Sequence, residues 1–248
     1  EERVCLEVYE QIFDDYFLLI MACDHSTAYG TIVGIKKAYP KKRLGVIWID
    51  AHADIHTPFT TPSGNMHGMP LSMACGLDNL ECKVNDPRGE TLDYWEQIKN
   101  VGMPGPKILP EDLVYIAVRD LEKPENYLIN KYNINFIEVE EVKKMGAATS
   151  AQRALEMLEH CDLIYVSFDV DSIDSRFSTG TGTPVPNGLT VEEAKILNAE
   201  LCKDAKVCAW EIVEVNPTLD TENRMAESAF EIMEASANSI MSRPVIAE

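Results

Sequence analysis

Basic residues are scarce in this chain. Of its 248 residues, 22 are Lys or Arg and 41 are Asp or Glu, which gives a formal net charge of −19 with His neutral. Proteins that bind nucleic-acid phosphates or anionic membrane surfaces do so through basic patches. The shortage of positive charge therefore argues against both kinds of partner, whereas metal cations or a cationic small substrate would suit so acidic a protein.

Paired cysteines and long apolar runs are also missing. The seven cysteines are scattered without a CxxC spacing, which is typical of reduced thiols rather than of a disulfide framework. No stretch reaches the roughly 18 apolar residues that a membrane span needs. The segment EERVCLEVYEQIFDDYF begins with Glu1 rather than Met and lacks the layout of a signal peptide. We therefore expect a soluble protein of the cytoplasm.

Apolar and charged residues are present in the proportions of a globular protein. Hydrophobic residues make up 46% and charged residues 25% of the chain, which excludes the disordered class. The length suits one large α/β domain. No low-complexity linker divides the chain, so we expect a single domain over residues 1–248, with residues 78–110 forming a long surface excursion from it.

Short apolar runs alternate with helical patterns. The runs cover residues 17–22, 44–49, 113–118, 134–139, 163–168 and 207–215, and the helical patterns cover 27–39, 125–131, 149–159, 190–201 and 222–239. Continuous apolar runs are typical of parallel strands buried on both faces. A TIM barrel would need eight strand–helix units, and only about six are present. The alternation predicts an α/β fold, a three-layer αβα sandwich with a mostly parallel β-sheet.

Polar side chains follow most of the predicted strands. His25 follows the first run; Asp50, His52 and Asp54 the second; Asp120 and Glu122 the third; Asp169 and Asp171 the fifth; and Glu214 stands at the end of the last. Functional groups in such sheets lie just beyond the carboxyl ends of the strands. Delivery of so many carboxylates and imidazoles to one edge predicts a shared site.

The spacing of these residues favours a metal centre. Residues at i, i+2 and i+4 point to one side of an extended segment, so Asp50, His52 and Asp54 can converge on a cation. Adjacent carboxylates without a cation would repel each other, and carboxylate with imidazole suits Mn²⁺ or a related ion. Alone, each motif is as readily explained by solvated surface or by a core histidine. Together they predict two divalent ions sharing bridging carboxylates.

Six motifs resemble a known family. The segments CDHS, DAHADIHTP, SGNMHGMP, SFDVDSID, GTGTPVPNGLT and EVNP are similar to those of the ureohydrolase family, in family order and over most of the chain. SGN-x-HG resembles the arginases of that family rather than the agmatinases. The resemblance implies manganese-dependent hydrolysis of L-arginine to L-ornithine and urea by a hydroxide held between two ions.

The resemblance also implies roles for individual residues. One Mn²⁺ would be held by His25, Asp50, Asp54 and Asp169, and the other by Asp50, His52, Asp169 and Asp171; Asp54 would also orient the hydroxide, Glu214 and Thr183 would contact the guanidinium, and His67 would shuttle protons. Ser63, Asn65 and His56 would lie at the α-carboxylate, and Asp120, Glu122 and Glu125 at the α-amino group. Outside the family context, His67 is better explained as a turn histidine beside Gly68, and the Ser63–Asn65 segment is explained equally well as an ordinary turn.

Some positions depart from the family pattern. Ala22 and Cys23 replace a usual Gly-Gly, His56 replaces Asn, and Glu122 replaces Asp; Ser172 and Ser175 replace Gly and Pro. None removes a metal ligand. Few residues precede the strand before His25, so we expect the family's usual amino-terminal strand and helix to be lacking.

These departures leave two alternatives open. The chain could be another ureohydrolase, an agmatinase or guanidino-acid hydrolase, or a catalytically weak paralogue that serves as a binding or assembly partner. The family also implies a homo-oligomer, a trimer or hexamer.

Overall fold

A single parallel sheet organises the protein. The computed structural model describes residues 2–13 and 16–244, and these form a six-stranded sheet in the order β1-β6-β5-β2-β3-β4. The strands are β1 (Leu18–Met21), β2 (Leu44–Ile49), β3 (Leu113–Ile116), β4 (Asn135–Ile137), β5 (Leu163–Asp169) and β6 (Val207–Val213). Every strand pairing is parallel, so all six carboxyl ends lie at one edge. The predicted α/β fold is confirmed, and each apolar run coincides with a strand to within a few residues at its ends.

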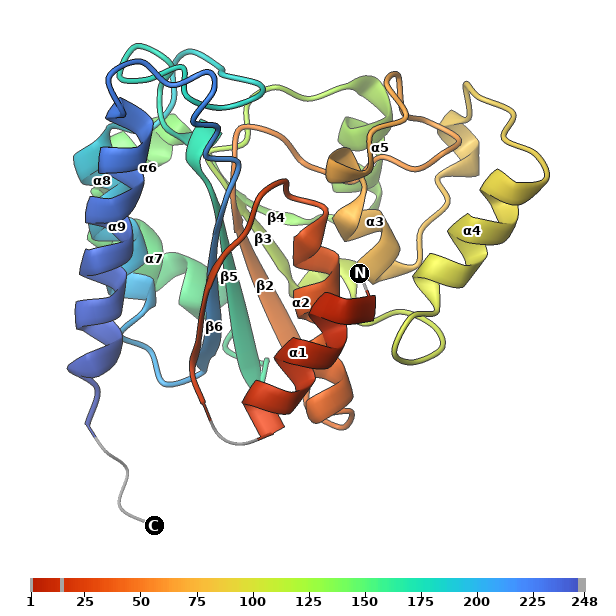
Figure 1. Ribbon diagram of the computed structural model, residues 1–248, viewed down its shortest axis with the longest axis horizontal. Helices are drawn as coiled ribbons and strands as arrows, with labels where there is room; N and C mark the ends of the chain where they lie inside the picture. The colour runs from red at the N-terminus through yellow and green to blue at the C-terminus, as the bar shows by residue number, and fades with distance from the viewer. Residues whose placement is uncertain (1, 14–15, 245–248) are drawn as a thin grey trace.

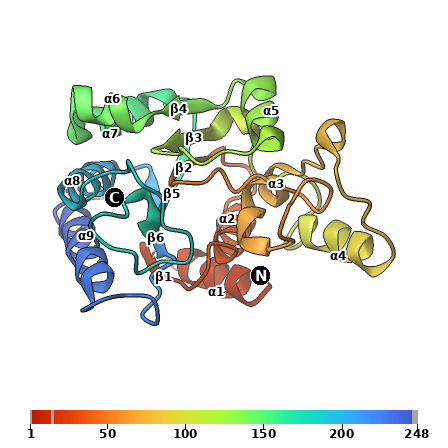
Figure 2. The same ribbon diagram turned by 90° about the horizontal axis from the view of Figure 1, so that it is seen from above.

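Helices cover both faces of the sheet (Figures 1 and 2). The helices are α1 (Glu2–Phe13), α2 (Thr27–Ala38), α3 (Pro70–Cys75), α4 (Glu90–Lys99), α5 (Lys123–Tyr132), α6 (Val139–Met145), α7 (Ala147–Met157), α8 (Val191–Leu201) and α9 (Arg224–Met241). One buried cluster joins the sheet to α1–α5, and a second joins it to α6–α9. The molecule is thus the three-layer sandwich that the alternating pattern predicts.

The central strand β2 explains why its sequence is continuously apolar. Val46 and Trp48 pack in the cluster beneath α1–α5, whereas Ile47 and Ile49 pack in the cluster beneath α6–α9. Successive side chains of a strand point to opposite faces, and both faces are covered here. Every residue of β2 is consequently buried, and the first residues free to carry polar chemistry are those beyond Ile49.

A buried carboxylate fixes the start of α2. Glu211 of β6 is fully buried and accepts hydrogen bonds from the hydroxyls of Thr27 (3.0 Å), Thr31 (2.8 Å) and Tyr165 (2.6 Å). A buried charge is tolerated when hydrogen bonds satisfy it. Because Thr27 begins α2 just after the CDHS segment, this network also holds His25 near the ends of β5 and β6.

Several helices lie outside the predicted patterns. Helix α1 packs on α2 through Cys5, Val8 and Ile12, an apolar stripe too short to stand out in an otherwise acidic segment. The predicted surface excursion, residues 78–110, contains α4, whose Trp95 is buried and donates to Asp78 over 2.7 Å. Among the described residues, no helix has both the length and the apolar character needed to cross a membrane.

Helices α1 and α2 approach closely at Gly34, which yields a prediction for stability. A Cβ atom at Gly34 would lie 2.6 Å from Cβ of Val8 and 2.9 Å from the carbonyl oxygen of Cys5. Gly34→Ala must therefore push the helices apart, and we expect it to lower the free energy of unfolding by about 1–3 kcal/mol in urea denaturation. Gly68→Ala is the matched control, because no heavy atom lies within 4 Å of its added Cβ. Equal stabilities of the two variants would contradict the close contact.

Candidate metal centre

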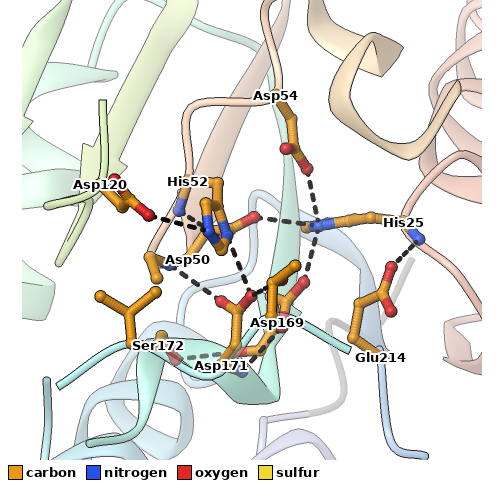
Figure 3. A network of polar contacts seen from close by, with 12 residues as sticks. His25, Asp50, His52, Asp54, Asp120, Asp169, Asp171, Ser172 and Glu214 are labelled. Atoms are coloured by element: carbon orange, nitrogen blue, oxygen red, sulfur yellow. Dashed lines mark hydrogen bonds and ion pairs between the residues drawn. The ribbon is translucent and has the colours of Figure 1, made fainter. Parts of the chain in front are cut away.

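Three carboxylates converge on one imidazole nitrogen at the carboxyl edge of the sheet (Figure 3). Nδ1 of His25 lies 3.0 Å from Asp50, 3.2 Å from Asp54 and 3.2 Å from Asp169. His25 is held from behind, because its ring stacks on Trp48 at 3.9 Å and its Nε2 lies 2.7 Å from the Ser167 hydroxyl. The ring can therefore turn no other nitrogen toward the aspartates.

The His25 nitrogen is the point where a cation fits. Nδ1 is buried and makes no hydrogen bond despite its three carboxylate neighbours. Buried polar atoms are almost always hydrogen-bonded, so an orphaned one needs an explanation. Nδ1 and the oxygens of Asp50 and Asp54 lie within 4.8 Å of one another, a spacing at which one ion could contact all three. The residues present fit a divalent metal ion.

A second group shares Asp50 with the first. Nδ1 of His52 lies 3.0 Å from Asp171 and 3.5 Å from Asp50, and these three residues also form a group that could hold a metal. Backbone N–H groups orient the carboxylates: His52 donates to Asp50 over 2.7 Å, and Asp171 donates to Asp169 over 2.7 Å. The two groups are adjacent, and Asp50 could bridge their ions.

Burial and crowding shift the pKa values of this cluster in opposite directions. Burial, reinforced by neighbouring carboxylates, raises the pKa of Asp54 and holds that of Asp169 well above its ordinary range. Burial opposes ionisation of Asp50 too, but the imidazoles of His25 and His52 outweigh it and lower the pKa of Asp50. Like charges this close cannot all ionise without a compensating cation. Bound divalent ions would supply that compensation.

Unusual backbone conformations aim two of the acidic side chains. Asp54 and Glu214 have φ values of 48° and 66°, in the left-handed region that few non-glycine residues adopt. Asp54 is fixed there by the N–H of Leu71, which donates to its carbonyl over 3.1 Å. Glu214 donates its N–H to Cys23 over 2.8 Å and accepts from the N–H of His25 over 2.8 Å. Such strain is typical of functional sites.

A cavity of about 280 Å³ opens above the cluster. Its lining includes every predicted site residue except His25 and Asp50, which lie beneath it: His52, Asp54, His56, Ser63, Asn65, His67, Asp120, Glu122, Glu125, Asp169, Asp171, Thr183 and Glu214. The structure thus brings the predicted residues together around one space. It tests none of their individual roles, which remain predictions.

The wall of the cavity has two distinct regions. Near the aspartates, Nδ1 of His67 lies 3.5 Å from Glu214, and the Thr183 hydroxyl donates to Asp171 over 3.1 Å. Farther out, Nε2 of buried His56 lies 3.5 Å from Glu125 and 3.7 Å from Glu122. The first region could act on a reacting group, and the second could bind a polar substrate end.

A third His, Asp and Cys group lies elsewhere. Asp112, His160 and Cys161 are close enough to share an ion. However, Nε of Arg43 already contacts both oxygens of Asp112, at 2.8 and 3.0 Å. The charge of this carboxylate is neutralised within the protein, unlike the charges around His25.

Two residues that hold the cluster were not predicted. Trp48 donates from Nε1 to Asp50 over 2.9 Å, and Ser167 contacts His25. Their positions carried a usable signal, because Trp48 lies two residues before Asp50 and Ser167 two before Asp169. Residues at this spacing share a face of the strand, so a polar or hydrogen-bonding residue there supports the one that follows.

Comparison with known proteins gives a consistent result. The sequence model of the arginase family matches residues 2–237. Arginase of Bacillus subtilis (strain 168) is 33% identical over 234 residues, which are 94% of this chain and 73% of that protein. Arginase-1 of Homo sapiens is 38% identical over 203 residues, covering 81% of this chain and 58% of that protein. A crystal structure of the Bacillus subtilis arginase superposes with a TM-score of 0.83 at 32% identity, over 99% of this chain and 78% of the other.

The buried carboxyl group of Glu125 makes stability depend on pH. Burial raises its pKa from 4.5 to about 8, so the folded protein holds a proton that the unfolded chain has released. The free energy of unfolding should therefore fall by about 1 kcal/mol per pH unit as pH rises from 5 to 8. In metal-free protein, Glu125→Gln should remove this dependence of the free energy of unfolding on pH, measured by urea denaturation at several pH values. Exposed Glu122→Gln is the control; equal slopes in both variants would refute the assignment.

Proposed function

Because this chain belongs to the arginase family, whose enzymes are hydrolases acting on the guanidino group of arginine, we propose that it hydrolyses L-arginine to L-ornithine and urea. The resemblance recognised in its motifs is confirmed. The observation that carries the proposal is the convergence of Asp50, Asp54 and Asp169 on the orphaned His25 nitrogen, directly beneath the cavity.

Two manganese ions are the proposed cofactor. His25, Asp50, Asp54 and Asp169 would hold one, and Asp50, His52, Asp169 and Asp171 the other. Oxygen and imidazole ligands suit Mn²⁺. When bound, the pair of cations supplies a hydroxide near neutral pH, because it lowers the pKa of water. Asp54, which lies in the cavity wall as well as beside His25, would orient the attacking group.

Glu214 is the proposed guanidinium ligand. Its carboxylate lies at the cavity and is oriented by the N–H of His25 at 2.8 Å. A carboxylate can accept two parallel N–H bonds from a planar guanidinium. Such a pair would place the guanidinium carbon over the aspartate cluster, with the Thr183 hydroxyl as a second contact.

His67 is the proposed proton carrier. It is half-buried, and the Glu214 carboxylate raises its pKa above the ordinary value. A raised pKa keeps the imidazolium form available near neutrality, where it can donate to the departing amine. Its place in the cavity wall next to Glu214 puts that donor beside the proposed guanidinium position.

The outer part of the cavity suits an amino acid rather than a simple amine. Ser63 and Asn65 offer hydroxyl and amide donors to an α-carboxylate, whereas Asp120, Glu122 and Glu125 offer carboxyl groups to an α-amino group. His56 also lines this cavity, in contact range of Glu122 and Glu125. Recognition of both charges would favour L-arginine over agmatine, which lacks the carboxylate.

We also propose that residues 1–248 form one catalytic domain and that the protein assembles as a homo-oligomer, a trimer or hexamer. Its proposed location is the cytoplasm, and its proposed place is in arginine metabolism, such as the urea cycle. The single sheet supports the first of these. The cysteines, all unpaired in the described structure, support the location. Size measurement in solution would test the oligomer.

A substrate panel tests the activity. Manganese-loaded protein should release urea from L-arginine with kcat/KM at least about tenfold above that for agmatine, since one lost charged contact is worth that much. Guanidinobutyrate and formimidoylglutamate complete the panel. Ser63→Ala should lower the rate with L-arginine and leave that with agmatine unchanged. Urea from agmatine but not from L-arginine would instead identify another ureohydrolase, and no product from any substrate would identify an inactive paralogue.

Replacement of His67 tests the proton carrier. His67→Ala should lower kcat by about 10²- to 10⁴-fold while leaving the manganese content unchanged, because the residue transfers a proton and holds no ion. His160→Ala serves as the control, since His160 contacts Asp112 outside the cavity. An unchanged kcat in His67→Ala would remove this residue from the mechanism.

A further inference from the structure

The guanidinium of Arg119 donates all of its hydrogen bonds to backbone carbonyls. Its Nε donates to Pro186 (2.9 Å), Nη1 to Ala117 (3.1 Å) and Ser172 (3.3 Å), and Nη2 to Asp171 (2.9 Å) and Val185 (2.8 Å). A guanidinium has five N–H donors, so each is matched by one carbonyl. No carboxylate among the described residues forms an ion pair with it, although this part of the protein is rich in aspartates.

The surroundings of Arg119 are shaped to admit it. A Cβ atom at Gly188 would lie 2.6 Å from Nη2 of Arg119 and 2.4 Å from the carbonyl oxygen of Ser172. Only glycine therefore leaves room for the guanidinium at this point. Ala117, which supplies one of the carbonyls, has a φ of 69°, a conformation that alanine rarely adopts. Both of these local features lie directly against the guanidinium.

Arg119 joins three segments that carry one of the two candidate metal groups. Its backbone N–H and that of Asp120 both donate to the carbonyl of Ala51, each over 2.9 Å, and Ala51 stands between Asp50 and His52. Its side chain holds the backbone of Asp171 and Ser172 just after β5. It also holds Val185 and Pro186, in the loop that contains Thr183.

The side chain of Asp171 depends on the same segments. Its Oδ1 accepts from the N–H of Ala51 over 3.1 Å, and its Oδ2 accepts from the hydroxyl of Thr183 over 3.1 Å. Oδ2 also lies 3.0 Å from His52 Nδ1. If the backbone of Asp171 moved, Oδ1 would lose its bond to Ala51 and Oδ2 its present direction toward His52. The group of His25, Asp50 and Asp54 has no hydrogen bond to Arg119.

We propose that Arg119 is a positioning residue that sets the geometry of the metal position formed by Asp50, His52 and Asp171. The inference rests on the proposed two-ion function, which it deepens by making the two positions depend on different parts of the chain. Arg119 is not among the proposed ion ligands or the residues that line the cavity. It acts through the backbone of Asp171 and the loop of Thr183.

Electrostatics and positioning predict opposite effects of replacing Arg119 on the affinity for the ion. Arg119 carries a positive charge close to a cation site, so removing the charge alone would strengthen binding of a second cation. Loss of positioning would weaken it, by about 10- to 100-fold for a residue that orients a ligand. The two effects oppose each other, so weaker binding confined to this one ion would point to lost geometry rather than to lost charge.

Manganese titration of the metal-free protein, with free Mn²⁺ read from its electron paramagnetic resonance signal, tests the proposal. Wild type should bind two ions. Arg119→Met should bind one ion with unchanged affinity and the other at least about tenfold more weakly. Arg119→Lys should also bind the second ion weakly, because an ammonium keeps the charge but has only three donors. Gly188→Ala displaces the guanidinium without removing it, and we expect it to weaken the binding of the same ion.

Arg43→Met is the matched control, since Arg43 also makes several bonds but holds Asp112. It should lower stability without changing either affinity. The positioning role would be overturned if Arg119→Met bound both ions with unchanged affinity. It would also be overturned if Arg119→Met and Arg43→Met each bound both ions more weakly to the same extent. Wild type that binds fewer than two ions would instead overturn the proposed function, and this inference with it.

Discussion

The repulsion among buried carboxylates at the carboxyl edge of the sheet is the constraint on which the rest depends. Asp50, Asp54, Asp169 and Asp171 are all buried, and in the part of the chain that the structure describes their cationic contact partners are the imidazoles of His25 and His52. Such an arrangement is costly unless a cation completes it. The stacked Trp48, the Ser167 hydroxyl and the left-handed Asp54 all act to keep these groups together rather than to relieve them.

The opposite end of the sheet shows how the protein treats a carboxylate that needs no ion. Asp112 is as buried as Asp169, yet Arg43 and His160 both contact it. Beside Asp171, by contrast, the guanidinium of Arg119 donates to backbone carbonyl groups and forms no ion pair with a described carboxylate. The placement of cations, more than the number of acids, therefore distinguishes the candidate centre from an ordinary buried ion pair.

The sequence was sufficient for the sheet, and it named residues that the structure brings together around one cavity. Continuous apolar runs such as residues 44–49 identify a strand because both faces are covered, and the strand ends then locate Asp50 and Asp169. It was insufficient for α1, whose apolar stripe is short, and for the bonds of Arg119, which go to backbone carbonyls that no side-chain pattern reveals. Long-range backbone contacts depend on the whole fold, whereas periodicity is local.

Strand order has a consequence for synthesis of the chain. Among the described residues, β1 lies at the edge of the sheet and pairs with β6 alone, so this pairing cannot form until residues 207–213 have been synthesised. His25 follows β1 and cannot reach its aspartates until that pairing forms. Because non-local pairing is slow and domains fold as they emerge, the partly made chain exposes an unpaired apolar strand on the ribosome. Ion capture at this site can follow only after residues 207–213 have been synthesised.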